Sequence, residues 1–217
     1  MKNYIFYGFA LAALTLAPIG VSAQKYNTDA VPAGTDLSAL KFDTPVIIDS
    51  DVVFADSDNK WIAMSADVQA ITQVPIEKMY AVLHDLANQP NVFNKGVSKT
   101  KSVVIKSSRP DGVTAEFTTT AVGQDTTYTA LVTENLNLPD SALITVKQTE
   151  PNAQIRNVYA TWYVASMTVN GAKCTYIRFY DSNEAAGGAI KKGLVNAGIN
   201  GAHTSTIKQL IDGARNR

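Results

Sequence analysis

The sequence has few of the residues that form disulfide bonds or bind metal ions. Cys174 is the only cysteine among 217 residues, which excludes an internal disulfide framework and a cysteine-rich zinc site. The two histidines, His84 and His203, lie far apart in sequence, so metal catalysis has few ligands to draw on. We therefore expect no metal and no other cofactor.

An excess of charge of either sign is also missing. Lysine and arginine number 19, aspartate and glutamate number 19, and the formal net charge is 0. This balance gives no basic footprint for nucleic acid, so no nucleic-acid partner is expected. Hydrophobic residues make up 46% and charged residues 18%, which is typical of a compact globular domain rather than a disordered chain.

Long apolar runs are confined to the N-terminus. There a short basic start precedes an apolar stretch, Tyr4 to Ala17, and then the small residues Val21 and Ala23. This order is typical of a secretory signal peptide, which we place at residues 1–23 with cleavage after Ala23. The alternative is an uncleaved membrane anchor, because the run up to Ala23 is just long enough to span a bilayer. Cleavage predicts a soluble mature protein that is periplasmic or secreted.

The rest of the chain divides into a lead-in and one domain. Residues 24–59 are the predicted N-terminal lead-in, polar up to Ser38 and then carrying two short β-like runs. From residue 60 to residue 217 the patterns become regular. Alternating apolar residues from Trp61 to Ala70 predict a strand. Apolar residues at helical spacing then predict a helix over residues 76–88.

The middle of the domain is rich in β-pattern and the end is helical. Asn170-Gly171 is the strongest hairpin signal, because a tight primed turn needs positive φ. No long helical pattern separates the strands, so an antiparallel sheet is expected. The final segment returns to helical spacing, and we expect Ile190, Leu194 and Val195 to face the sheet. The predicted strands cover residues 102–107, 113–122, 126–133, 142–148, 155–168 and 172–181.

This order of elements resembles the helix-grip fold, and more closely the START-type lipid-binding branch of the Bet v 1-like (SRPBCC) superfamily. The resemblance covers residues 60–217. The resemblance rests mainly on the stretch from Val68 to Asp85, a strand that leads to a Pro-x-Glu-x-x-Tyr helix ending in Leu-His-Asp. The resemblance is supported more weakly by Ala160 to Tyr163, by the strand Thr175 to Asp181, and by Gly187-Gly188 before the last helix. The proline that the family places at that helix start is absent here.

The resemblance implies an α+β fold in which a curved antiparallel sheet wraps around a long C-terminal α-helix and encloses an internal hydrophobic cavity. Phe117, Tyr128 and Trp162 are candidate cavity-wall residues, with ordinary core packing as the equal alternative. Ile190 and Leu194 are the candidates from the last helix.

Tyr176 and Arg178 share one face of the last strand, and Ile177 and Phe179 share the other. If the Arg178 face turns inward, the charge needs a partner, either Glu116 or a polar group of the ligand. In the alternative, which we favour, this face is the outer solvated one and Ile177 and Phe179 form the core.

The function expected from these features is non-catalytic binding or transfer of a lipid or another hydrophobic small molecule, with transient membrane-surface contact near Lys191-Lys192. No acid or base converges on the cavity with a partner at defined spacing, so His84, His203 and Cys174 are not expected to be catalytic. The alternatives are a cyclase- or hydrolase-like enzyme on the same fold and a protein-interaction module built on the lead-in, because fold alone does not decide function.

Overall fold

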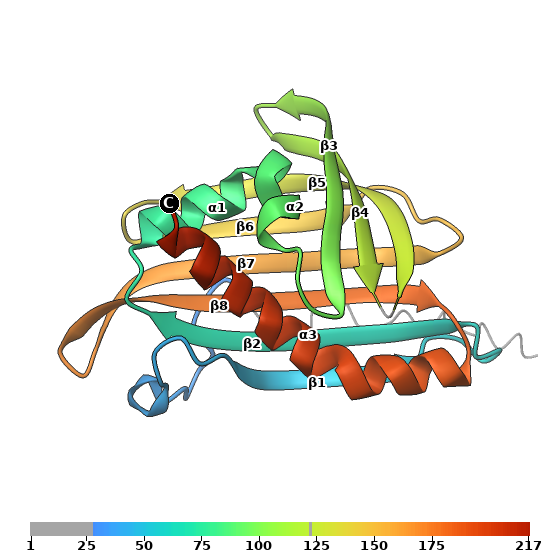
Figure 1. The fold of residues 1–217 in the computed structure, drawn as a ribbon, viewed down its shortest axis with the longest axis horizontal. Coiled ribbons are helices and arrows are strands. Elements are labelled where there is room, and N and C mark those ends of the chain that lie inside the picture. The colour runs from blue at the N-terminus through green and yellow to red at the C-terminus, as the bar shows by residue number, and fades with distance from the viewer. Residues whose placement is uncertain (1–27, 122) are drawn as a thin grey trace, which may run out of the picture.

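The structure is built on one eight-stranded antiparallel sheet, with the helices α1, α2 and α3 on one face (Figure 1). The computed structural model describes residues 28–121 and 123–217, so the predicted signal peptide lies outside the described residues. The strands are β1 (Val46–Phe54), β2 (Trp61–Thr72), β3 (Ser98–Arg109), β4 (Gly112–Ala121), β5 (Gln124–Asn137), β6 (Ser141–Gln148), β7 (Ile155–Val169) and β8 (Ala172–Ala186). The helices are η1 (Leu37–Ala39), α1 (Ile76–His84), η2 (Leu86–Asn88), α2 (Gln89–Val92) and α3 (Ala189–Arg215).

The order of strands in the sheet is β1-β2-β8-β7-β6-β5-β4-β3. After β2, the chain passes through α1, η2 and α2 to the opposite edge of the sheet. It then returns strand by strand as a meander until β8 pairs with β2. The predicted antiparallel sheet and long C-terminal helix are thus confirmed.

The β7–β8 hairpin turns at Asn170 and Gly171, which have φ of 51° and 79°. Val169 pairs with Ala172 across this two-residue turn. Positive φ at both central positions is the geometry that a primed turn needs, and Asn-Gly supplies it at the least cost. The hairpin predicted from these two residues is therefore present, and it sets the register of β7 and β8 from the turn back to Tyr159, where the pairing shifts.

The main core lies between the inner face of the sheet and the helices. Ile177 and Phe179 of β8 and Trp162 of β7 pack there with Ile207 and Leu210 of α3. The first half of α3 packs elsewhere: Val195 and Ile199 contact Val52 of β1 and Ile62 of β2 in a second cluster. The helix therefore crosses the sheet diagonally and begins over the β1–β2 edge (Figure 1). None of the described helices is long and apolar enough to span a membrane.

The outer face of the sheet is covered by residues 28–42, here called the strap. Val31, Leu37 and Leu40 of the strap pack against a buried cluster made of Ile71, Val169, Cys174 and Tyr176. Beyond the strap, β1 pairs with β2 along its whole length. The boundary predicted at residue 60 therefore falls between two paired strands, and part of the lead-in is an edge of the sheet.

Candidate ligand-binding site

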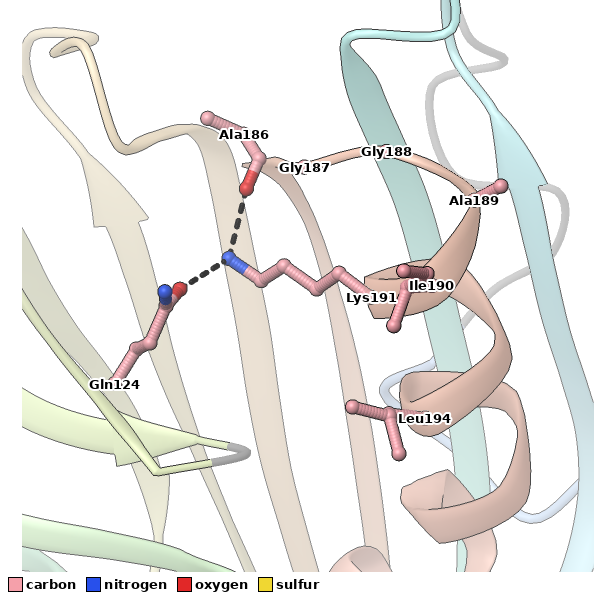
Figure 2. A pocket seen from close by; sticks show the side chains of 8 residues that line it. All are labelled: Gln124, Ala186, Gly187, Gly188, Ala189, Ile190, Lys191 and Leu194. Carbon is pink, nitrogen blue, oxygen red and sulfur yellow. Dashed lines mark hydrogen bonds between the residues drawn. The ribbon is translucent and has the colours of Figure 1, made fainter.

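An open groove lies where α3 begins, beside the β4–β5 hairpin and the end of β8 (Figure 2). The chain leaves β8 at Ala186 and passes through Gly187 and Gly188 into the helix. The groove has a volume of about 660 Å³. It is lined by Gln124, Ala186, Gly187, Gly188, Ala189, Ile190, Lys191 and Leu194.

Lys191 spans the groove. Its Nζ donates hydrogen bonds to Gln124 Oε1 at 2.9 Å and to the Ala186 carbonyl oxygen at 2.7 Å (Figure 2). Partial burial lowers the pKa of Lys191, because desolvation disfavours the ammonium form. The stem of this lysine passes so close to Gly187 that a Cβ there would collide with Lys191 Cδ. Glycine at position 187 is what lets the lysine take this path.

Ile190 and Leu194 do not face the sheet as expected: Ile190 is 85% exposed and Leu194 is 55% exposed. The reason is that α3 begins over the β1–β2 edge, where Val195 and Ile199 make the contact with the strands. Residues four apart share one side of a helix, so Ile190 and Leu194 lie together on the neighbouring side. They form an exposed aliphatic pair that lines the groove.

The predicted wall residues Phe117, Tyr128 and Trp162 lie on the inner face, in two settings. Trp162 is buried in the main core, where its ring stacks on Phe179 with centroids 4.0 Å apart and on Phe93 at 5.9 Å. Phe117 and Tyr128 are register partners on β4 and β5, and their rings stack at 5.5 Å. Tyr128 keeps an accessible part of its side chain, whereas Phe117 is buried.

A partly buried histidine–aspartate pair, His203 and Asp181, joins α3 to the inner face of β8. His203 Nε2 lies 3.1 Å from Asp181 Oδ2, and His203 Nδ1 lies 2.8 Å from the Ile199 carbonyl oxygen. Both ring nitrogens thus face acceptors, an arrangement that only an imidazolium satisfies with a hydrogen on each nitrogen. Desolvation lowers the pKa of His203, but the hydrogen bond and charge of Asp181 and the Ile199 carbonyl outweigh it, so the pKa is raised.

Sequence reasoning set His203 aside because no partner stood at a defined spacing. Asp181 is that partner, 22 residues away in sequence. A signal for the pair was available: Asp181 follows Ile177 and Phe179 at period two, so it shares the face of β8 that packs against α3. Strand alternation alone would have placed a carboxylate opposite the last helix.

Tyr176 and Arg178 lie on the outer face and do not meet the groove. Arg178 donates from Nε to Asp67 Oδ1 at 3.0 Å and from Nη2 to Asp67 Oδ2 at 2.6 Å. The Tyr176 hydroxyl donates to Gln69 Oε1 at 3.0 Å. Because Ile177 and Phe179 face α3, alternation turns residues 176 and 178 outward.

The favoured interpretation of Arg178 was thus correct on the face and wrong on solvation. Arg178 is 2% exposed because the strap covers it, and its Nη1 donates to the Ala30 carbonyl oxygen at 2.7 Å. The partner suggested for an inward Arg178 was Glu116, which instead pairs with Lys106 at 3.3 Å. Arg178, a ligand candidate in the sequence analysis, forms an ion pair with Asp67 away from the groove.

A second polar cluster lies on the surface at the far end of the molecule. The Tyr80 hydroxyl donates to Glu134 Oε2 at 2.8 Å, and His84 Nδ1 lies 2.9 Å from Glu134 Oε1. Partial burial and the neighbouring Glu134 carboxylate raise the pKa of Tyr80 to about 12. The cluster joins α1 to β5, away from the start of α3 (Figure 1), and it does not contribute to the groove.

Comparison with known proteins identifies the fold. No protein-family model and no curated protein matches the sequence. Among solved structures, human STARD10 matches with a TM-score of 0.54 and 11% identity over 76% of this chain and 72% of that one. The STAR-related lipid transfer protein of Xanthomonas axonopodis matches with a TM-score of 0.52 and 13% identity over 76% and 98%. The chain therefore shares the helix-grip fold with these two proteins.

Proposed function

We propose that the protein binds a lipid or another hydrophobic small molecule between α3 and the inner face of the sheet, and carries it without changing it chemically. The observation that supports this most is the exposed aliphatic pair, Ile190 and Leu194, at an open groove. Ligand sites are concave and lined mostly by apolar side chains, as this groove is. Covering them would contribute about 25 cal/mol for each Å² of apolar surface removed from water.

The proposed compartment is the periplasm or the exterior, reached after cleavage of residues 1–23. The support is the sequence of that segment, with its basic start, apolar run and Val21-Ser22-Ala23 end. A hydrophobic molecule that crosses an aqueous compartment has to be shielded from water. A soluble exported protein with an apolar groove would supply that shielding.

Transient contact with a membrane surface is part of the same proposal. Among residues 28–121 and 123–217, Ile190 is the most exposed large hydrophobic residue. It stands in the first turn of α3, beside Lys191 and Lys192. An exposed aliphatic residue next to a cation suits the interface of an anionic bilayer, and this contact would place the groove at the source of its ligand.

Native mass spectrometry of the purified mature protein tests the proposal. We expect a bound species of lipid mass that is lost on organic extraction and returns after incubation with vesicles made from total polar lipids. Chromatographic identification of the extract then gives the ligand. A protein that carries no adduct from cells and takes none from vesicles would contradict lipid binding.

An enzymatic function is the second candidate, and the His203–Asp181 pair is the observation that favours it. The Asp181 carboxylate, which His203 holds through Oδ2, is placed to accept a proton from a bound substrate, as a general base does. On this hypothesis, a cyclase- or hydrolase-like activity toward esters or polyketide-like substrates would disappear in a folded His203→Ala variant. Ligand that is extracted chemically unchanged after prolonged incubation would favour the carrier instead.

A further inference from the structure

The groove at the start of α3 is lined by one charged side chain, that of Lys191. The other lining residues are one glutamine, two alanines, two glycines, one isoleucine and one leucine. Lys191 Nζ donates to two neutral acceptors, Gln124 Oε1 and the Ala186 carbonyl oxygen. Among residues 28–121 and 123–217, no carboxylate lies within ion-pair distance of this ammonium. The groove therefore holds a positive charge that the described residues do not neutralise.

The acidic residues closest in sequence to the groove lining are already paired with other cations. Asp125, which follows Gln124, forms an ion pair with Lys101 at 2.6 Å. Glu184, near the end of β8, forms one with Arg156 at 2.6 Å. Neither carboxylate is available to Lys191, so an opposite charge in the groove has to come from a bound molecule.

The ammonium of Lys191 also has hydrogen-bonding capacity left for a ligand. A lysine ammonium carries three N–H donors, and two of them are used for Gln124 and Ala186 (Figure 2). The stem of the lysine runs close against Gly187, where an added Cβ would lie 2.4 Å from Lys191 Cδ. The groove thus presents a cation with a free donor, on a stem that Gly187 accommodates.

A wholly neutral ligand would leave this cation worse solvated than in the empty groove. An apolar molecule that covers Ile190 and Leu194 displaces water from the neighbouring ammonium, and removing hydration from a charge is costly unless an opposite charge replaces it. Partial burial already lowers the pKa of Lys191 because no carboxylate offsets the desolvation. An anionic head group would replace the lost water with a charge-assisted hydrogen bond, which is stronger than a neutral one.

The surface for a hydrocarbon chain lies in the same groove. Ile190 precedes Lys191 in the sequence, Leu194 follows one helical turn after Ile190, and all three side chains line the groove (Figure 2). Ile190 is 85% exposed and Leu194 is 55% exposed, so both have apolar surface to cover. The groove volume of about 660 Å³ falls within the range of roughly 300 to 1,000 Å³ that is usual for small-molecule sites.

We propose that the ligand is an anionic amphiphile whose head group binds the Lys191 ammonium and whose hydrocarbon chain covers Ile190 and Leu194. This inference rests on the proposed function. It adds the chemical class of the ligand: an acceptor-only, negatively charged head on an apolar chain.

Three probes with a ten-carbon chain test the inference on the unmodified mature protein: sodium decanoate, 1-decanol and decyltrimethylammonium. We expect calorimetric titration at about pH 7 and low salt to show decanoate binding about 10-fold tighter than decanol, and the cation binding weakest. Decanol or the cation binding as tightly as decanoate would overturn the anionic class and leave the proposed function standing. Failure of all three probes to bind would overturn the proposed function itself.

Sodium acetate separates an amphiphile site from a simple anion site, because it has the same head group without the chain. We expect no heat of binding from acetate at concentrations that saturate the protein with decanoate. Acetate that binds as tightly as decanoate would show that the chain contributes nothing, which would overturn the amphiphile.

Lys191→Gln removes the charge and keeps a polar side chain in the groove. We expect this variant to lose about 10-fold in decanoate affinity and to bind decanol as the parent protein does. Lys192→Gln is the matched control: it changes the net charge equally, but Lys192 Nζ lies over the Phe54 ring of β1, 5.5 Å from its centroid. Circular dichroism and thermal unfolding establish that each variant is folded. A folded Lys191→Gln protein that still prefers decanoate over decanol would exclude Lys191 as the head-group site.

Discussion

Arg178 on β8 and Asp67 on β2 form a two-bond ion pair across a diagonal of the sheet. The register sets Arg178 opposite Gln69 and Asp67 opposite Tyr180, yet the guanidinium reaches both oxygens of Asp67 at 3.0 and 2.6 Å. Both side chains are almost fully buried, Arg178 at 2% and Asp67 at 0% exposure. The strap covers this ion pair on the outer face of the sheet, away from the groove. Arg178 in turn holds the strap through its hydrogen bond to the Ala30 carbonyl oxygen.

Replacing Arg178 with alanine should destabilise the protein and leave ligand affinity unchanged. The variant strands a buried carboxylate at Asp67, a change that costs ~3 to 5 kcal/mol. The double variant Arg178→Met with Asp67→Leu should recover much of the free energy of unfolding, because it removes both charges. Urea unfolding of the three proteins measures the effect. A large loss of ligand affinity in the folded Arg178→Ala protein would place the arginine in the binding site.

Leu194→Asp should weaken ligand binding sharply without unfolding the protein. Leu194 is 55% exposed and lines the groove, so a carboxylate is solvated in the empty protein but has to be desolvated against an apolar ligand. Val104→Asp is the matched control, since Val104 is 47% exposed on β3. Lipid titration and thermal melting should be read together. Unchanged affinity in a folded Leu194→Asp protein would mean that the ligand does not contact this part of α3.

The periodicity of apolar residues in the sequence predicted the strands of the sheet and the helix α3. Alternation and Asn170-Gly171 were enough for the meander and its hairpin, and helical spacing was enough for α3. It could not show where α3 lies across the sheet, because Ile190, Leu194 and Val195 are equally apolar and only the tertiary contact with β1 and β2 decides which is covered. The burial of Arg178 depends on the strap, and the polar composition of the strap gave no sign that it packs on the sheet.

Protonation of His203 should make stability depend on pH. The pKa of His203 is raised above its unfolded value, so the stabilisation is complete below about pH 6.5 and is lost as the pH rises through the raised pKa. We expect the melting temperature to fall as the pH rises above about 6.5. In His203→Gln this part of the pH dependence should be absent, whereas His84→Gln should retain it. Identical pH profiles for the parent and His203→Gln would contradict the ion pair.

Cys174 should report on the strap. Its thiol is buried under the strap cluster with Val31, Leu37 and Leu40, and burial raises its pKa. Since the thiolate is the reactive form, the folded protein should react slowly with a thiol reagent. Leu40→Ala should loosen the cover and speed the reaction several-fold, while the remote Val104→Ala should not. Equal reaction rates in the parent and Leu40→Ala proteins would show that the strap does not control access to Cys174.

The lysine that crosses the groove has a consequence for how a ligand enters. The tie between α3 and the β4–β5 hairpin at this point is a flexible side chain, held by one amide oxygen and one carbonyl oxygen. A partly exposed lysine side chain changes rotamer faster than packed elements move collectively, which takes microseconds or longer. We therefore expect a change of rotamer at Lys191 to be enough to open the groove at this point, without a rearrangement of the backbone.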